Sequence, residues 1–352
     1  MSLTARAFFL TAPNAPLVER DLELATPGPG QAIVAVEACG MCHTDLGFSS
    51  GSVKPNHALP LVLGHEVVGT VVEAGDAELV GKRVIVPAVM SCGACAFCRA
   101  GRGNACLSQK MPGNDIHGGF ASHLAVPSAA LVFADDLPGS IDPKTLGVVA
   151  DAVSTAYQAV ARAELGEGDV AFVIGAGGVG GYVIQIAQAL GAKVVACDVS
   201  DDRLKLMAAY GADEQVNVAG LDDREVRKVL HGIAQKWGVP SLRHRIFECS
   251  GTAAGQQLAY ALVARAATLM LVGYTFDKVT VRLSNLMAYD ATVHGTWGCP
   301  VEAYAPVLDL IRAGKVKLEP FVEFAPMSSV NQQLLAMAEH RLTRRMVLQP
   351  SA

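Results

Sequence analysis

The sequence has no long hydrophobic run and few charged residues. No segment approaches the roughly 18 unbroken apolar residues of a membrane-spanning helix, and the first ten residues lack the basic-then-apolar pattern of a signal peptide. Only 17% of the residues are charged, and the net charge of -5 is spread without runs of like sign. This excludes the basic surface that nucleic acid or an anionic membrane needs. We therefore predict a cytoplasmic protein whose partner is a small molecule.

The chain has 352 residues, which is enough for two domains of roughly 100–200 residues each. Between residues 31 and 87, short β-rich runs alternate with glycine and proline (Ala32–Val36, Val67–Glu73 and Arg83–Val86), which is typical of a β-barrel. After Leu165, predicted strands and helices alternate, which indicates a parallel, doubly wound sheet. We expect strands at 169–174, 193–198, 215–218, 245–249 and 267–274, and helices at 179–190, 201–210, 222–237 and 252–265. Near the end we expect a helix at 301–313 and a strand at 345–349 that returns to the first domain.

A glycine-rich turn separates the first of these strands from the helix that follows. Its spacing is G-x-G-x-x-G, which lets the backbone approach a pyrophosphate held at a helix N-terminus. A turn without a ligand is the alternative. We assign to the cofactor Gly175, Gly177, Gly178, Val179 and Gly180.

The next predicted strand ends at Asp198, 23 positions after Gly175. A carboxylate at this place accepts hydrogen bonds from the adenosine ribose and repels a 2′-phosphate. Val199 and Ser200 follow instead of an arginine, so the sequence favours NAD over NADP. Arg203 is close enough to be a candidate for stacking on the adenine.

Six of the nine cysteines lie in two clusters, which favours metal sites over disulfides. Four of them fall within 15 residues: Cys92, Cys95, Cys98 and Cys106. Four thiolates complete the tetrahedral coordination of zinc and leave no open position, so we predict a structural zinc. Redox cysteines and an iron–sulfur cluster are the competing interpretations.

A second set of metal donors lies upstream in the β-rich half. Cys42 and His65 offer a soft and a borderline ligand from neighbouring segments. A catalytic zinc needs fewer protein ligands than a structural one, because one position must stay free for a substrate oxygen. The pair therefore predicts a catalytic zinc, whereas either residue alone would indicate a structural role.

The order of these motifs resembles the zinc-dependent medium-chain dehydrogenase/reductase family over essentially the whole chain. The resemblance rests on Gly64-His65-Glu66, the four-cysteine loop, Gly118-Gly119-Phe120-Ala121 and the glycine turn. It implies an α/β protein with a GroES-like β-barrel catalytic domain (residues 1–153 and 295–352) and a Rossmann NAD-binding domain (154–294). It also implies a zinc- and NAD-dependent alcohol dehydrogenase that forms a homo-oligomer, a dimer or a tetramer.

The resemblance assigns further residues to the catalytic zinc. Asp151 matches the third protein ligand, and Glu66 matches a residue that enters the coordination sphere while water or substrate exchanges. Asp45 matches a carboxylate that orients His65.

The resemblance also assigns a route for the substrate proton. Thr44 matches the hydroxyl that takes the alcohol proton, but the histidine that many relatives carry a few residues later is absent. We hypothesise that His43 passes the proton to solvent. The alternative is that His43 only lines the cofactor phosphates.

Four stretches (83–90, 111–123, 247–255 and 281–288) resemble more closely those family members that oxidise a cyclic allylic alcohol carried as an acyl-CoA thioester in anaerobic aromatic degradation. Reduction of the enone-CoA is the reverse reaction. The CoA phosphates could be met by dispersed cations: Lys54, Lys110, Arg341, Arg344 or Arg345. The favoured interpretation of each, however, is a solvated surface charge. A polyol or simple secondary-alcohol dehydrogenase is the alternative. A non-catalytic relative is disfavoured, since such relatives commonly lack the zinc ligands.

Overall fold

The computed structural model describes residues 2–351, so the ends of the predicted catalytic domain, Met1 and Ala352, lie outside the described residues. The chain folds into two compact units. The first contains the residues up to Ser154, residues 298–305 and the residues from Leu318 on, and the second contains Thr155–Trp297 and Pro306–Lys317.

Residues 295–297 and Ser154 lie on the other side of the predicted division, and so does one longer segment. Residues 306–317, which the sequence analysis placed with the catalytic domain, belong to the second unit. Lys317 is joined to that unit by two hydrogen bonds with Gln185, one from its own N–H to Gln185 Oε1 (2.8 Å) and one from Gln185 Nε2 to its carbonyl (3.3 Å). A long-range contact of this kind has no local sequence signal.

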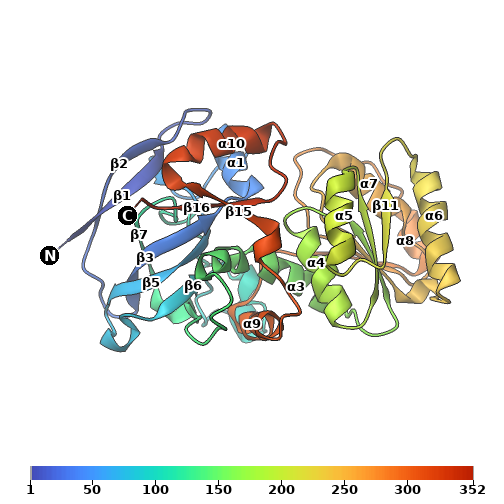
Figure 1. Ribbon diagram of the computed structural model, residues 1–352, viewed down its shortest axis with the longest axis horizontal. Helices are drawn as coiled ribbons and strands as arrows, with labels where there is room; N and C mark the ends of the chain where they lie inside the picture. The colour runs from blue at the N-terminus through green and yellow to red at the C-terminus, as the bar shows by residue number, and fades with distance from the viewer. Residues whose placement is uncertain (1, 352) are drawn as a thin grey trace. The chain divides into compact units, whose positions relative to one another are not determined.

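The first unit is built around two sheets (Figure 1). The larger has seven strands in the order β15-β16-β3-β5-β6-β8, with β7 also paired to β3, and the smaller has the order β2-β1-β4. The strands are β1 (Leu3–Leu10), β2 (Val18–Leu24), β3 (Gln31–Gly40), β4 (Leu61–Val62), β5 (Glu66–Ala74), β6 (Arg83–Val86), β7 (His123–Pro127), β8 (Val132–Phe133), β15 (Val322–Pro326) and β16 (Arg345–Gln349). The predicted return of the last strand is confirmed, because β16 pairs with β3.

The helices of the first unit are short and connect its strands. They include α1 (His43–Ser50), α2 (Ala96–Arg99), α10 (Val330–Ala338) and the 3-10 helix η4 (Pro143–Ala150), beside several three-residue 3-10 helices. Apolar side chains from both sheets form one core, and Leu63 and Val67 are fully buried in it. These two residues flank His65 and Glu66, so the predicted ligand segment is anchored on both sides by the core.

The second unit has the predicted parallel sheet, with six strands in the order β11-β10-β9-β12-β13-β14. The strands are β9 (Val170–Ile174), β10 (Lys193–Asp198), β11 (Glu214–Asn217), β12 (His244–Glu248), β13 (Thr268–Leu271) and β14 (Thr292–Gly295). All five residues of β9 are buried, as expected for a central strand covered on both faces. The order reverses direction beside β9, which is where an open parallel sheet binds its ligand.

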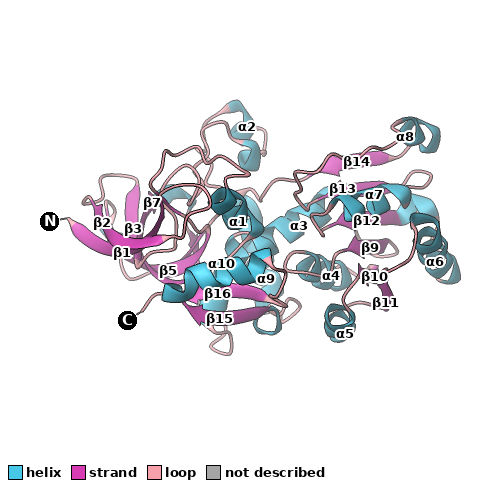
Figure 2. Cartoon of the chain, turned by 90° about the horizontal axis from the view of Figure 1, so that it is seen from above, coloured by secondary structure: helices cyan, strands magenta, loops and turns pink. Residues whose placement is uncertain are grey.

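Helices cover both faces of this sheet, with α4 and α5 on one side and α6 and α7 on the other (Figure 2). The helices are α3 (Ala152–Arg162), α4 (Gly180–Ala189), α5 (Asp201–Ala209), α6 (Asp223–Lys236), α7 (Ala253–Ala261), α8 (Ser284–Tyr289) and α9 (Tyr304–Arg312). The first residues of α3 (152–154) and of α9 (304–305) belong to the first unit. The GroES-like and Rossmann architecture expected from the sequence is confirmed. Within residues 2–351, no helix is long and apolar enough to cross a membrane.

Candidate metal and cofactor sites

Four predicted ligands meet in the first unit although they come from separate elements. Cys42 precedes α1, His65 immediately precedes β5, Glu66 is the first residue of β5, and Asp151 follows the 3-10 helix η4. Their ligand atoms all lie within 4.8 Å of one another. Asp151 Oδ2 is 3.8 Å from Cys42 Sγ and 3.7 Å from His65 Nε2. Because zinc bonds of about 2.0–2.3 Å place tetrahedral ligands roughly 3.4–3.8 Å apart, the spacing fits a zinc ion.

Several polar atoms in this cluster are buried without a hydrogen-bond partner. Within residues 2–351, both ring nitrogens of His65 and Oε2 of Glu66 are in this state. Burying unpaired polar atoms is costly, so native proteins pair nearly all of them. A metal ion bound between the two side chains would supply a partner for one of the ring nitrogens and for Glu66 Oε2, and the donor set therefore fits the zinc that the sequence predicts.

Asp45 supports the backbone next to two of the ligands. Its side chain is fully buried, Oδ2 accepts a hydrogen bond from Cys42 N (3.0 Å), and Oδ1 accepts one from Gly64 N (3.0 Å). Oδ1 lies 3.5 Å from His65 Nδ1, which is an ion-pair distance rather than a good hydrogen bond. Asp45 therefore holds the backbone at both ligands, in addition to facing the imidazole as the sequence suggested.

Arg345 belongs to this site, and the sequence analysis missed it. Its guanidinium donates to Glu66 Oε1 (2.6 Å) and to the carbonyl of Met41 (3.1 Å), and its side chain is only 7% exposed. The suggestion that Arg345 is one of the cations that meet CoA phosphates is therefore wrong, because its charge is buried and already paired. Arg345 and Glu66 are 279 positions apart, and the pairing of β16 with β3 and of β3 with β5 brings them together.

The charges around Glu66 shift the pKa of its carboxyl in opposite directions. Burial raises the pKa of the Glu66 carboxyl well above its usual value, and the negative charges of Cys42 and Asp151 raise it further, while Arg345 opposes the shift. The pKa of the His65 imidazole is also raised, since nearby carboxylates outweigh the effect of burial. The cluster thus gathers negative charge in a buried place, which is the setting that a divalent cation neutralises.

The two residues of the predicted proton route are neighbours at the start of α1. Thr44 is half-buried, with Oγ1 at 3.7 Å from Cys42 Sγ, whereas His43 is exposed. The structure therefore brings Thr44 to the metal ligands and His43 to the surface.

The run Gly118-Gly119-Phe120-Ala121 contacts the segment that leads into His65. The N–H groups of residues 118, 119 and 120 donate to the carbonyls of residues 62, 64 and 63, respectively. A Cβ on Gly119 would lie 2.2 Å from Val67 Cγ2, so only glycine allows this close approach. This run positions the ligand segment.

The four cysteines of the predicted structural site also lie together. Cys95 Sγ is 3.5 Å from Cys98 Sγ and 3.7 Å from Cys106 Sγ, and Cys92 Sγ is 3.9 Å from Cys98 Sγ. Zinc–sulfur bonds of about 2.3 Å place tetrahedral sulfurs roughly 3.8 Å apart, which matches these distances. A hydrogen bond from the backbone of Cys98 lowers the pKa of the Cys95 thiol to about 6, which favours the thiolate that binds metal.

The glycine turn joins β9 to α4 in the second unit. Gly175 has a φ of +90°, and a Cβ there would lie 2.6 Å from the backbone of Ser250. A Cβ on Gly180 would lie 1.8 Å from the carbonyl of Gly175. A Cβ on Gly177, in contrast, would meet nothing within 4 Å. The fold itself requires glycine at 175 and 180, whereas Gly177 leaves open space of the kind that a pyrophosphate needs.

Asp198 lies at the end of β10, next to this turn. It is buried, Oδ2 accepts a hydrogen bond from Ala176 N (2.8 Å), and Oδ1 accepts one from Ser200 N (2.9 Å). Each carboxylate oxygen can accept a second hydrogen bond, so these contacts leave acceptor capacity for a ribose. Arg203, on α5, lies 3.8 Å from Asp198 Oδ2. The structure thus brings the predicted cofactor residues to one end of the parallel sheet.

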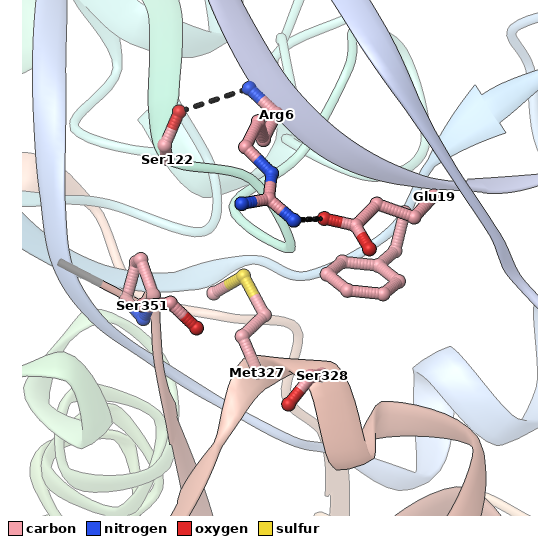
Figure 3. A pocket seen from close by; sticks show the side chains of 8 residues that line it. Arg6, Glu19, Ser122, Met327, Ser328 and Ser351 are labelled. Carbon is pink, nitrogen blue, oxygen red and sulfur yellow. Dashed lines mark hydrogen bonds and ion pairs between the residues drawn. The ribbon is translucent and has the colours of Figure 1, made fainter.

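A separate pocket lies in the first unit and contains none of the predicted site residues (Figure 3). Arg6 forms an ion pair with Glu19 across it, and Ser122 Oγ accepts a hydrogen bond from Arg6 N (3.1 Å). Since the charged groups are paired with each other and partly exposed, this pocket offers no reactive group and is not a candidate for the active site.

Comparisons with known proteins match both units. Residues 28–136 match the alcohol dehydrogenase GroES-like domain, and residues 178–313 match the zinc-binding dehydrogenase domain. An alcohol dehydrogenase from Geobacillus stearothermophilus is 32% identical over 91% of each chain. An NAD-dependent alcohol dehydrogenase from Sulfolobus acidocaldarius is 34% identical over 64% of this chain and 67% of the other. The structure of acetophenone reductase from Geotrichum candidum with NAD is similar at a TM-score of 0.85 and 26% identity, and the match covers 98% of this chain and 97% of that one.

Proposed function

Because this chain belongs to the zinc-dependent alcohol dehydrogenase family, and is thus an NAD-dependent zinc oxidoreductase that acts on CH–OH groups, we propose for it one particular alcohol. The substrate is 6-hydroxycyclohex-1-ene-1-carbonyl-CoA, a cyclic allylic alcohol beside a thioester. The product is 6-oxocyclohex-1-ene-1-carbonyl-CoA, formed in anaerobic benzoyl-CoA degradation.

The observation that carries this proposal is the resemblance of four stretches to 6-hydroxycyclohex-1-ene-1-carbonyl-CoA dehydrogenase. Two of the stretches lie at the candidate sites. Residues 111–123 include the run that packs against the segment before His65. Residues 247–255 include Ser250, which approaches Gly175 in the glycine turn. Similar sequence at these places supports a similar substrate.

We further propose that Cys42, His65 and Asp151 hold the catalytic zinc. Bound zinc would act as a Lewis acid that lowers the pKa of the substrate hydroxyl, and bound NAD would accept the hydride. Asp151 supplies a hard carboxylate where a second thiolate would donate more charge, which favours a more Lewis-acidic ion. Glu66 keeps Oε1 on Arg345, which leaves Oε2 to enter the site when ligands exchange.

The proton of the substrate hydroxyl needs a path to solvent. In our proposal Thr44 Oγ1 accepts it, because this hydroxyl lies beside Cys42 Sγ. His43, exposed one residue earlier, then passes a proton to water. Asp45 fixes the position of the start of α1 relative to the ligands, because its carboxylate accepts hydrogen bonds from Cys42 N and Gly64 N.

Kinetics with matched substrates tests the proposed alcohol. NADH formation is measured with the cyclic CoA thioester, with free cyclohex-2-enol and with cyclohexanol. We expect kcat/KM to favour the thioester by at least about 100-fold, because binding energy from the remote CoA moiety stabilises the transition state. Equal efficiency on cyclohexanol would contradict the CoA assignment.

A simple secondary-alcohol or polyol dehydrogenase is the second candidate, favoured by the alcohol dehydrogenases among the relatives. The same assay separates the two, since this candidate requires the highest kcat/KM on a small alcohol or polyol.

The reverse reaction raises the question of which carbon of the product accepts the hydride. The product is a conjugated enone, so hydride from NADH can reach the carbonyl carbon or the alkene carbon. We propose delivery to the carbonyl carbon, which regenerates the allylic alcohol. With NADH deuterated at C4, deuterium on the carbinol carbon is the expected result, and deuterium on the former alkene carbon would contradict it.

We also propose a cytoplasmic location and a homo-oligomer, a dimer or a tetramer. None of the nine cysteines, which all lie in the described part of the chain, forms a disulfide, and this suits a reducing compartment. Fractionation tests the location, and light scattering of the purified chain tests the oligomer.

A further inference from the structure

The backbone around Asp151 is held by two hydroxyl groups. The carbonyl of Ala150 accepts hydrogen bonds from Tyr304 Oη (2.5 Å) and from Ala88 N (3.1 Å). The carbonyl of Asp151 accepts a hydrogen bond from Ser154 Oγ (3.1 Å). Ser154 Oγ also lies 3.3 Å from Tyr304 Oη, so the two hydroxyls form one connected pair.

Both hydroxyls are deeply buried. Tyr304 and Ser154 are each 1% exposed, so water cannot easily replace either group. A buried tyrosine normally places its hydroxyl where it finds a partner, and removing that hydroxyl would leave the Ala150 carbonyl held by the Ala88 N–H without the second donor that helps fix its direction. Here the partners are the carbonyls of Ala150 and Asp151, which lie before and after the Asp151 Cα. Holding both carbonyls sets the direction in which the Asp151 side chain leaves the backbone.

Asp151 needs such support because it belongs to no regular element. It lies between the 3-10 helix η4 and α3, with φ −136° and ψ −64°, so no helical ladder fixes its backbone. A metal ligand must be held within about 0.5 Å of its productive position. Cys42 and His65, in contrast, are held through Asp45 and the sheet.

We propose that Tyr304 and Ser154 are positioning residues for the catalytic zinc, which they serve by holding the loop that carries Asp151. The inference rests on the proposed ligand role of Asp151. Neither hydroxyl needs to touch metal, cofactor or substrate. Removing either one should weaken the catalytic zinc site and leave the four-cysteine site in the same chain unaffected.

The test uses the full zinc-loaded chain with Tyr304→Phe and Ser154→Ala, each of which removes one hydroxyl. Thr145→Val is the matched control: Thr145 is also fully buried, lies in η4, and donates from Oγ1 to a carbonyl three residues earlier (2.7 Å), but at the far end from Asp151. Asp151→Ala reports separately on the ligand role. The readouts are the rate at which a chelator removes each zinc, and the visible spectrum after cobalt replaces the catalytic zinc.

We expect Tyr304→Phe and Ser154→Ala to bind the catalytic metal about 10- to 100-fold more weakly, the range found when residues that support a ligand are removed. The cobalt bands should shift, whereas the four-cysteine zinc should leave at the wild-type rate. Thr145→Val should behave as wild type in both readouts.

Two results would overturn the inference while leaving the ligand role intact. One is an unchanged chelation rate and cobalt spectrum in both variants when Asp151→Ala has lost the catalytic zinc. The other is equal loss from both zinc sites, which would indicate general unfolding. If Tyr304→Phe does not fold, Ser154→Ala decides by the same criteria. If Asp151→Ala keeps the catalytic zinc, the proposed ligand role fails, and the inference fails with it.

Discussion

The four-cysteine loop takes its donors from 15 consecutive residues, whereas the catalytic donors come from segments as far as 109 positions apart. In the loop, one of the four donors is buried, Cys106, and the donors are all thiols. In the catalytic set, two of the four are buried, His65 and Glu66, the donors are mixed, and further residues hold them in place. A closed site can therefore be built by local chain geometry, while an open, reactive site depends on the tertiary structure around it.

The largest expected effect comes from removing a catalytic ligand. His65→Ala should release the catalytic zinc and leave the four-cysteine zinc bound. Turnover should fall by at least about 1,000-fold, because Lewis-acid stabilisation is worth several kcal/mol and each 1.36 kcal/mol is tenfold in rate. Metal analysis together with NAD-dependent kinetics measures both effects. Loss of both metals from a folded protein would show that the two sites are not independent.

Breaking the buried ion pair comes next. Arg345→Met leaves Glu66 buried without its partner, which should cost about 3–5 kcal/mol of unfolding free energy. Arg344→Met is the control, since Arg344 is 45% exposed and lies 4.0 Å from Glu323. A surface pair of this kind contributes only about 0–1 kcal/mol. Denaturant unfolding of the zinc-loaded proteins compares them, and equal losses would argue against a special role for Arg345.

A smaller effect on activity is expected from removing a ligand of the four-cysteine loop. Cys95→Ser should release the structural zinc and lower Tm, because a bound structural metal contributes directly to stability. Turnover per catalytic zinc should stay within about twofold of wild type, because a zinc held by four thiolates has no open position for substrate. A twofold change corresponds to about 0.4 kcal/mol in the activation free energy. Cys197→Ala, at a buried position in β10, should lower Tm without zinc loss. A large fall in turnover per catalytic zinc would mean that the loop also shapes the reactive site.

The smallest effect is expected at His43. General acid–base catalysis typically contributes about 100- to 10,000-fold, and we expect less than this at an exposed position such as His43, where water can take the proton instead. His43→Ala should therefore change the pH dependence of kcat more than its maximum. His57→Ala, at another histidine of the first unit, should leave the profile as in wild type. An unchanged profile in His43→Ala would exclude His43 from the proton route.

Elements with a strong local pattern could be predicted closely. Arg83–Val86, Lys193–Asp198 and Arg345–Gln349 form strands with the predicted limits. Several elements were not predicted, among them the helices α3 and α8 and the strand β14. The segments of α8 and β14 are short, with six and four residues, so their local pattern is weak. Helix α3 has 11 residues with an amphipathic pattern that the sequence analysis missed.

The same division holds for the sites. The four-cysteine loop, the glycine turn and Asp198 could be found from the sequence alone, because their function depends on residues at short and regular spacing. The catalytic ligands could be listed from a family resemblance, but nothing local shows that Asp45 bridges Cys42 N and Gly64 N. The pairing of Arg345 with Glu66 and of Tyr304 with the Ala150 carbonyl was decided only by the tertiary structure. Buried polar groups must find partners wherever the fold places them, and those partners are often far away in the sequence.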